Sequence, residues 1–101
     1  MTRIQIRGGG WFNPDSARKW EESSTFDGRN QISDVTGSQW EHERLYRTAK
    51  GRWILHWFSQ WQGSKDRYKP IDDAEAAFWL TTCGYEPPTP ETAAAVEAAE
   101  I

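Results

Sequence analysis

Thiols and long apolar runs are nearly absent from this chain. Cys83 is the only cysteine in 101 residues, which excludes an internal disulfide and a cysteine-based metal cluster. A single cysteine is typical of proteins from reducing compartments. Residues 1–7 lack the apolar run of a signal peptide, and no stretch approaches the roughly 20 apolar residues of a membrane span. We therefore expect a cytoplasmic protein that does not contact membranes.

Catalytic motifs are missing as well. No Gly-Lys-Ser/Thr follows the glycines at 8–10, as a phosphate-binding loop requires. Ser59 and Ser64 do not lie in a nucleophile elbow. Cys83 falls at the predicted end of a helix, where the helix dipole disfavours a thiolate, and buried filler is its expected role. The sequence predicts neither enzymatic activity nor a cofactor.

The histidines are the nearest approach to a metal site. Glu41 and Glu43 share one face of a strand, and His42 between them points to the other. His42 could meet His56 across a hairpin, but two histidines without a third close ligand make a poor zinc site. We expect no metal, and pairing of these glutamates with arginines across the hairpin instead.

Aromatic side chains compensate for a modest number of aliphatic ones. The chain has the length of one domain and contains seven tryptophans. Each large aromatic side chain can bury on the order of 150–250 Å². We expect a single α+β domain over residues 1–86 and an alanine-rich helix or tail over residues 87–101.

The first third of the chain carries weak signals. Residues 3–7 alternate polar and apolar side chains, which predicts a strand. Asn13 followed by Pro14 suits a helix start, and a helix is predicted over 14–22 with Ala17 and Trp20 on one face. Residues 23–30 are predicted to form a loop that turns at Asp27-Gly28, and residues 31–35 a short edge strand.

The strongest signal is a hairpin of two aromatic strands, over 40–48 and 52–61. Gly51 suits the left-handed position of the connecting turn. The second strand places apolar side chains on both faces, which predicts a central strand covered on both sides. One face is expected to meet a helix, and what covers the other is left open. The alternation puts Trp53, Leu55 and Trp57 on one face and Ile54, His56 and Phe58 on the other.

The remaining elements follow at short intervals. Residues 67–71 are predicted to form a third sheet strand, with Pro70 at an edge. Asp72 can cap a helix over 73–82 that buries Ala74, Ala77 and Phe78, with Trp79 alongside. Thr89 and Pro90 predict a second helix start, and residues 92–101 are expected to dock through Val96 and Ile101. The predicted fold is an antiparallel sheet of three to four strands around the Trp-rich hairpin, packed by two to three helices.

The hairpin is also the candidate binding surface. The net charge is −3, but residues 44–69 hold seven bases and one acid, whereas residues 72–101 hold acids only. Cations interleaved with aromatic rings suit a protein interface or single-stranded nucleic acid. The competing interpretation is that the rings are core and the charges are solvated. The candidate residues are Arg44, Tyr46, Arg47, Arg52, Trp53, His56, Trp57 and Trp61.

Several segments resemble a family of small uncharacterised bacterial proteins common in actinobacteria and cyanobacteria. The likeness rests on residues 26–33 (Phe-Asp-Gly-Arg-Asn-Gln-Ile-Ser), 36–43 (Thr-Gly-Ser-Gln-Trp-Glu-His-Glu), 45–48 and 51–63, and it continues to Gly84-Tyr85. Some members of that family carry a C-terminal ribbon-helix-helix segment, as antitoxin-type regulators do, which these residues do not contain. The resemblance implies a regulatory or mobile-element setting and transfers no catalytic residue.

Three functions follow as hypotheses. The first is a non-enzymatic protein-interaction or regulatory module that self-associates or binds a protein partner. The second is a single-stranded nucleic-acid binder that uses the basic aromatic hairpin. The third is a small anti-defence inhibitor comparable to anti-CRISPR proteins.

Overall fold

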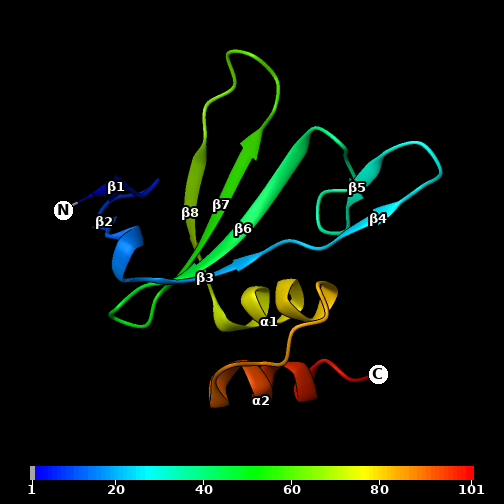
Figure 1. The fold of residues 1–101 in the computed structure, drawn as a ribbon. Coiled ribbons are helices and arrows are strands. Elements are labelled where there is room, and N and C mark those ends of the chain that lie inside the picture. Colours follow the sequence, from blue (N-terminus) through cyan, green and yellow to red (C-terminus); the bar gives the residue numbers. More distant parts are fainter. Residues whose placement is uncertain (1) are drawn as a thin grey trace.

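A four-stranded antiparallel sheet organises the α+β fold of residues 2–101, which the computed structural model describes (Figure 1). Its order is β3-β6-β7-β8, so the predicted hairpin of β6 and β7 is central. The strands span Arg18–Glu21 (β3), Glu41–Arg47 (β6), Trp53–Ser59 (β7) and Arg67–Ile71 (β8). This confirms the predicted hairpin and the strand over 67–71.

The turn between β6 and β7 forms as the sequence predicts. The amide of Thr48 donates to the carbonyl of Arg52 (2.8 Å), and the amide of Gly51 donates to the carbonyl of Thr48 (2.9 Å). Gly51 has φ +83°, a left-handed conformation that a side chain would strain. The register that results places Leu45 opposite Leu55 at the centre of the hairpin.

The sheet is buried on both faces, and two different elements cover it. On one face, α1 (Asp73–Thr82) packs on a cluster formed by Trp20, Leu45 and Trp53. On the other face, Tyr46 and Ile54 pack against the amino-terminal hairpin, which consists of β1 (Ile4–Gln5) and β2 (Trp11–Phe12). The covering that the sequence left open is therefore the chain's own amino-terminal segment.

The helix predicted over 14–22 is wrong. Asn13 does cap a helical turn, since its side chain accepts from the amide of Asp15 (3.0 Å), but the turn is a 3-10 helix, η1, that ends at Ser16 (Pro14–Ser16). The chain then extends as β3, where Trp20 pairs with Leu45 and is buried. Pairing with β6 satisfies the backbone and buries the indole at once, which a short isolated helix cannot do.

The loop predicted over 23–30 is wrong for Ser24–Phe26, which form a strand of a second small hairpin, whereas its predicted turn at Asp27-Gly28 is confirmed. This hairpin consists of β4 (Ser24–Phe26) and β5 (Gln31–Ser33), and it projects beside the main sheet (Figure 1). The predicted edge strand therefore exists in part, but its partner is β4, and the edges of the main sheet are β3 and β8. Asp27 forms the turn by accepting from the amides of Arg29 and Asn30, both at 2.8 Å.

Helix α1 has the predicted bounds but a different buried face. Asp72 caps it by accepting from the amide of Glu75 (2.8 Å). Ala76, Trp79 and Leu80 face the sheet, whereas Phe78 is 77% exposed and Ala74 is also exposed, so the predicted stripe through these two residues is wrong. Two stripes with the same i, i+3, i+4 spacing were possible, and the helix buries the one that contains Trp79 and Leu80.

Helix α2 (Pro90–Ala98) lies against α1 on the side away from the sheet (Figure 1). Thr89 and Thr92 form a capping box, and Thr92 is fully buried. Val96 is half-buried as expected, but Ile101 is exposed, so docking through Ile101 is wrong. Within residues 2–101, neither helix is long and apolar enough to cross a membrane.

The two sides of α1 provide a matched test of this packing. Leu80→Ala should lower the free energy of unfolding by about 2–5 kcal/mol, because it empties space in the core. Phe78→Ala on the same helix should change it by no more than about 0.5 kcal/mol, because the ring is exposed. Urea denaturation at constant pH measures both values, and equal losses would contradict the orientation of α1.

Candidate interaction surface

The eight residues proposed from the sequence do not form one surface. Tyr46, Trp53 and His56 are buried in the two cores. At the end of the hairpin near its turn, the Arg47 guanidinium lies 4.9 Å above the ring of Trp53, and Arg52 is exposed. Arg44, Trp57 and Trp61 lie toward the opposite end of the sheet, from which the β7–β8 loop extends. The structure thus separates the candidates by burial and by position along the hairpin.

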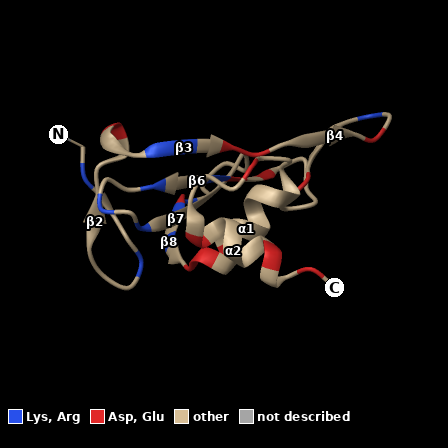
Figure 2. Cartoon of the chain, turned by 90° about the horizontal axis from the view of Figure 1, so that it is seen from below, with Lys and Arg blue, Asp and Glu red and all other residues tan. Residues whose placement is uncertain are grey.

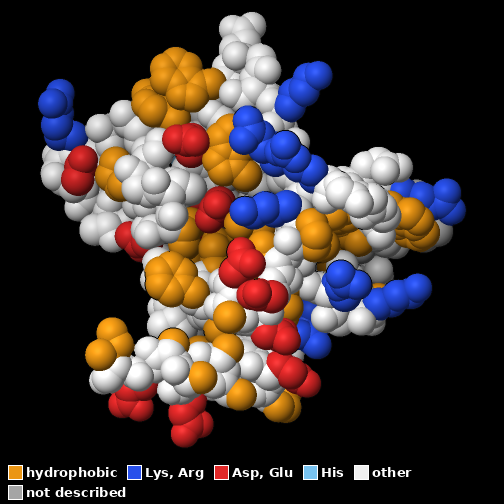
Figure 3. Space-filling view, turned by 180° about the vertical axis from the view of Figure 1, so that it is seen from behind, with side chains coloured by type: hydrophobic (Ala, Val, Ile, Leu, Met, Phe, Trp, Pro, Cys, Tyr) orange, Lys and Arg blue, Asp and Glu red, His pale blue; other side chains and the backbone are white. Residues whose placement is uncertain are grey.

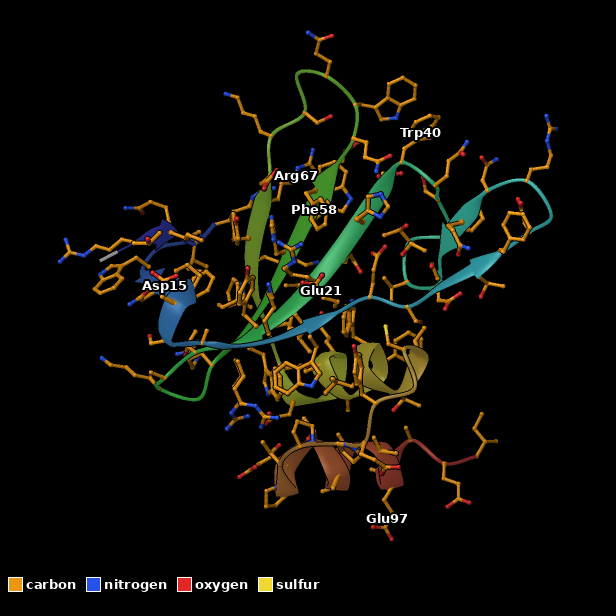
Figure 4. All side chains as sticks on the ribbon, viewed as in Figure 1. Asp15, Glu21, Trp40, Phe58, Arg67 and Glu97 are labelled. Carbon is orange, nitrogen blue, oxygen red and sulfur yellow. The ribbon has the colours of Figure 1, made fainter. Side chains whose placement is uncertain are left out.

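An exposed aromatic pair lies at that opposite end, which we call the distal end. The ring centroids of Trp40 and Trp61 are 5.1 Å apart, and their planes are inclined by 42°. Trp40 is 42% exposed and Trp61 60% exposed (Trp40 is labelled in Figure 4). Sequence reasoning missed Trp40, although the hairpin places it next to the end of β7. The predicted hairpin already indicated this position, because the pairing of Glu41 with Ser59 places Trp40 beside Gln60, the residue before Trp61.

Two arginines shield the neighbouring rings on the two faces of the sheet. The guanidinium carbon of Arg67 lies 4.8 Å from the centre of the Trp57 ring, and that of Arg44 lies 4.8 Å from the Phe58 ring. Such cation–π contacts hold the arginines in place. The N–H edge of Arg67 stays available, whereas Nε of Arg44 donates to Glu21 (3.3 Å). We define the distal aromatic surface as Trp40, Trp57, Phe58 and Trp61 with Arg44 and Arg67.

Backbone hydrogen bonds fix both exposed tryptophans. The Ser38 hydroxyl accepts from the amide of Trp40 (2.9 Å), and the Ser59 hydroxyl accepts from the amide of Trp61 (3.1 Å). The carbonyl of Trp40 in turn accepts from the amide of Gln60 (3.0 Å), which ties the two segments together. The pair is therefore held in position before any partner arrives, and this lowers the entropy lost on binding.

Glu22 connects the main sheet to the β4–β5 hairpin. One carboxylate oxygen accepts from the amide of Glu43 (2.6 Å) and from the hydroxyl of Ser33 (2.9 Å). The other oxygen lies 2.8 Å from Nδ1 of His42. The Glu22 side chain is only 14% exposed and Ser33 only 1%, so this is a partly desolvated network. No sequence pattern predicted this network, because its residues come from three separate segments, around positions 22, 33 and 42–43.

Charge divides between the strands and the helices. Lys and Arg residues lie mainly on the sheet and the amino-terminal hairpin, whereas the helices carry Asp and Glu and no Lys or Arg (Figure 2). The view from behind shows the same division, with blue side chains above the red ones that line the helices (Figure 3). The distal end carries both signs of charge, because exposed Glu41 and Asp66 lie there with Arg44, Lys65 and Arg67.

His56 ties the base of the β7–β8 loop to the sheet. Its Nε2 lies 2.8 Å from Oδ2 of Asp66, and its ring stacks on Tyr68 at 4.2 Å. The residue is 4% exposed, and burial lowers its pKa even though Asp66 opposes the shift. His42 does not join it, because the Phe58 ring contacts both imidazoles. Within residues 2–101, no three His, Cys, Asp or Glu side chains are placed to hold a metal ion.

No protein-family model, curated protein or solved structure matches this chain.

Glu22 and Glu21 are adjacent acids with different surroundings. Glu22→Ala should cost about 1–3 kcal/mol of stability, because the partly buried donors Ser33 and Glu43 lose their acceptor. Glu21→Ala should cost about 1 kcal/mol or less, because its 53% exposed side chain pairs only with Lys19 and Arg44 at the surface. Urea denaturation of both variants tests the network, which is refuted if Glu21→Ala is the more damaging.

The depressed pKa of His56 predicts acid sensitivity. The unfolded chain binds a proton near pH 6.5 and the folded chain only at lower pH, so the free energy of unfolding should fall from pH 7 to pH 5.5. His56→Phe keeps an aromatic ring against Tyr68 but removes the titrating group, so its stability should vary less over this range. Chemical denaturation at several pH values gives both slopes, and identical slopes would rule out His56 as the cause.

Proposed function

We propose that this protein is a non-enzymatic protein-interaction module that acts through the distal aromatic surface. The observation that carries the proposal is the exposed, pre-positioned Trp40–Trp61 pair. Tryptophan and arginine are the residues that most often dominate binding energy at protein interfaces. Exposed indoles whose backbone is held by hydrogen bonds are unfavourable in water and suit a partner that covers them.

The groups that could serve catalysis are engaged in structural contacts. His56 is buried beneath Tyr68 and bonded to Asp66, and His42 is bonded to Glu22. Cys83 packs half-buried against the cluster between α1 and the sheet. These contacts support a binding role.

The distal end is less suited to nucleic acid than to protein. Single-stranded nucleic acid needs free cations beside open ring faces. At the distal end Arg67 and Arg44 already contact Trp57 and Phe58, and the exposed acids Glu41 and Asp66 would repel phosphates. Arg44 is also paired with Glu21 at 3.3 Å. A partner that offers a carboxylate to Arg67 and an apolar surface to Trp40 and Trp61 fits better, and a second copy of the chain is the first such partner to test.

Light scattering combined with size-exclusion chromatography tests this at several protein concentrations. Wild-type protein should show a mass that rises with concentration, and Trp40→Ser/Trp61→Ser should remain a monomer of 11.7 kDa. Phe26→Ser is the matched control, because Phe26 is 60% exposed but lies on the β4–β5 hairpin. Association that persists unchanged in the double tryptophan variant would refute the role of the distal surface. The proposal would also be refuted if the wild-type protein stays monomeric and every partner that it binds is bound equally well by the double variant.

A further inference from the structure

A groove lies at the end of the sheet opposite the distal aromatic surface and shares no residue with that surface. It has a volume of about 530 Å³ and lies between the amino-terminal hairpin and the β6–β7 turn. Volumes of roughly 300–1,000 Å³ are typical of ligand pockets. Phe12, Ile54 and Pro70 form part of an apolar wall, and Lys50 and Arg52 lie at the turn side. We call it the hairpin groove.

One aromatic face and an open stretch of backbone border the hairpin groove. Trp11 is 51% exposed and lines the groove, with the guanidinium carbon of Arg3 at 4.9 Å from the centre of its ring. Gly9 and Gly10 line it as well, with φ of +116° and +90°, and a side chain at either would meet no atom within 4 Å. The absence of side chains there lets a ligand approach the backbone closely.

The cations around the groove lack partners of opposite charge. No ion pair within residues 2–101 involves Arg3, Arg7, Lys50 or Arg52. Asp72 and Asp73 at the start of α1 keep their charge, although Asp72 caps the helix and Asp73 accepts from the indole of Trp53 (2.9 Å). With Glu75 they line a neighbouring hollow that also contains Arg52, outside the hairpin groove. The residues that line the groove include Lys50 and Arg52 and no acid, so its lining is positive although the whole chain carries −3.

We propose that the hairpin groove binds single-stranded nucleic acid, with a base against Trp11 and the apolar wall and the flanking phosphates on Arg3, Lys50 and Arg52. This site is independent of the proposed protein interface, because it uses other residues at the other end of the sheet. A flat apolar ring inside the groove with anionic groups at its rim is the chemistry of a nucleotide. Duplex DNA cannot offer this combination, because its bases are paired and stacked.

The test measures anisotropy of a labelled oligothymidylate of about 15 nucleotides, a length near the upper site size of single-strand-binding modules. Lys50→Ala/Arg52→Ala should lower the slope of log Kobs against log salt by about 1.4, since each phosphate contact to a single strand contributes about 0.7. Trp11→Ala should weaken binding by about 5- to 150-fold through lost stacking.

Lys65→Ala/Arg67→Ala is the matched control, because it removes the same two charges at the distal end. It should leave the salt slope within error of the wild-type slope, and so should Trp40→Ser/Trp61→Ser. Circular dichroism verifies that each variant is folded. If Lys50→Ala/Arg52→Ala and Lys65→Ala/Arg67→Ala lower the salt slope equally, the effect is one of net charge and the proposed site is overturned.

Three further results would also overturn the proposal. The wild-type protein could fail to bind the oligonucleotide. A DNA duplex, or a polyglutamate peptide of equal charge, could bind as tightly as the single-stranded oligonucleotide does. The last would assign the groove to an acidic protein segment. None of these outcomes alters the oligomerisation test of the distal surface, so the two proposals fail separately.

Discussion

The pairing of β6 with β7 imposes a constraint that the rest of the molecule satisfies. Because β7 carries apolar or aromatic side chains on both faces from Trp53 to Phe58, both faces of the hairpin must be shielded from water. Helix α1 shields Trp53 and Leu55, and the amino-terminal hairpin shields Ile54. These covers are shorter than the hairpin. Exposed rings and grooves therefore remain where the covers end, and both proposed binding surfaces lie at those places.

Charge follows the same architecture. The cations lie on the strands and their turns, where the long stems of Arg67, Arg44 and Arg47 pack on aromatic rings. The helices carry acids and no bases, at capping positions such as Asp72 and on solvated faces, whereas other acids such as Glu21 and Glu43 lie on the strands. A net charge of −3 therefore describes neither end of the sheet. Local potential is the more useful guide to partners in a protein with this distribution.

Elements fixed by local signals could be predicted from the sequence, and elements fixed by distant partners could not. The turn at Gly51 and the caps at Asp72 and Thr89 use residues close in the chain, and they appear where expected. The segment around Trp20 has a helical start signal and a compatible apolar spacing, but its pairing with β6 outweighs both. Secondary-structure preference is weak beside such tertiary pairing.

The candidate site was predicted in part for the same reason. A basic aromatic hairpin is visible in the sequence, and Trp57, Trp61 and Arg44 belong to the distal surface. Burial could not be deduced for Tyr46, Trp53 and His56, because it depends on covers that come from both ends of the chain. Arg67 and Trp40 were missed because their roles arise from contacts with Trp57 and Trp61.

The closeness of Trp40 and Trp61 has an optical consequence. Two indoles whose centres are 5.1 Å apart and whose planes are inclined by 42° have strongly coupled electronic transition dipoles. Coupled chromophores in a chiral, fixed arrangement produce a paired positive and negative band in the circular dichroism spectrum. The distal end of the sheet thus carries its own exciton signal, which depends on the relative orientation of the two rings.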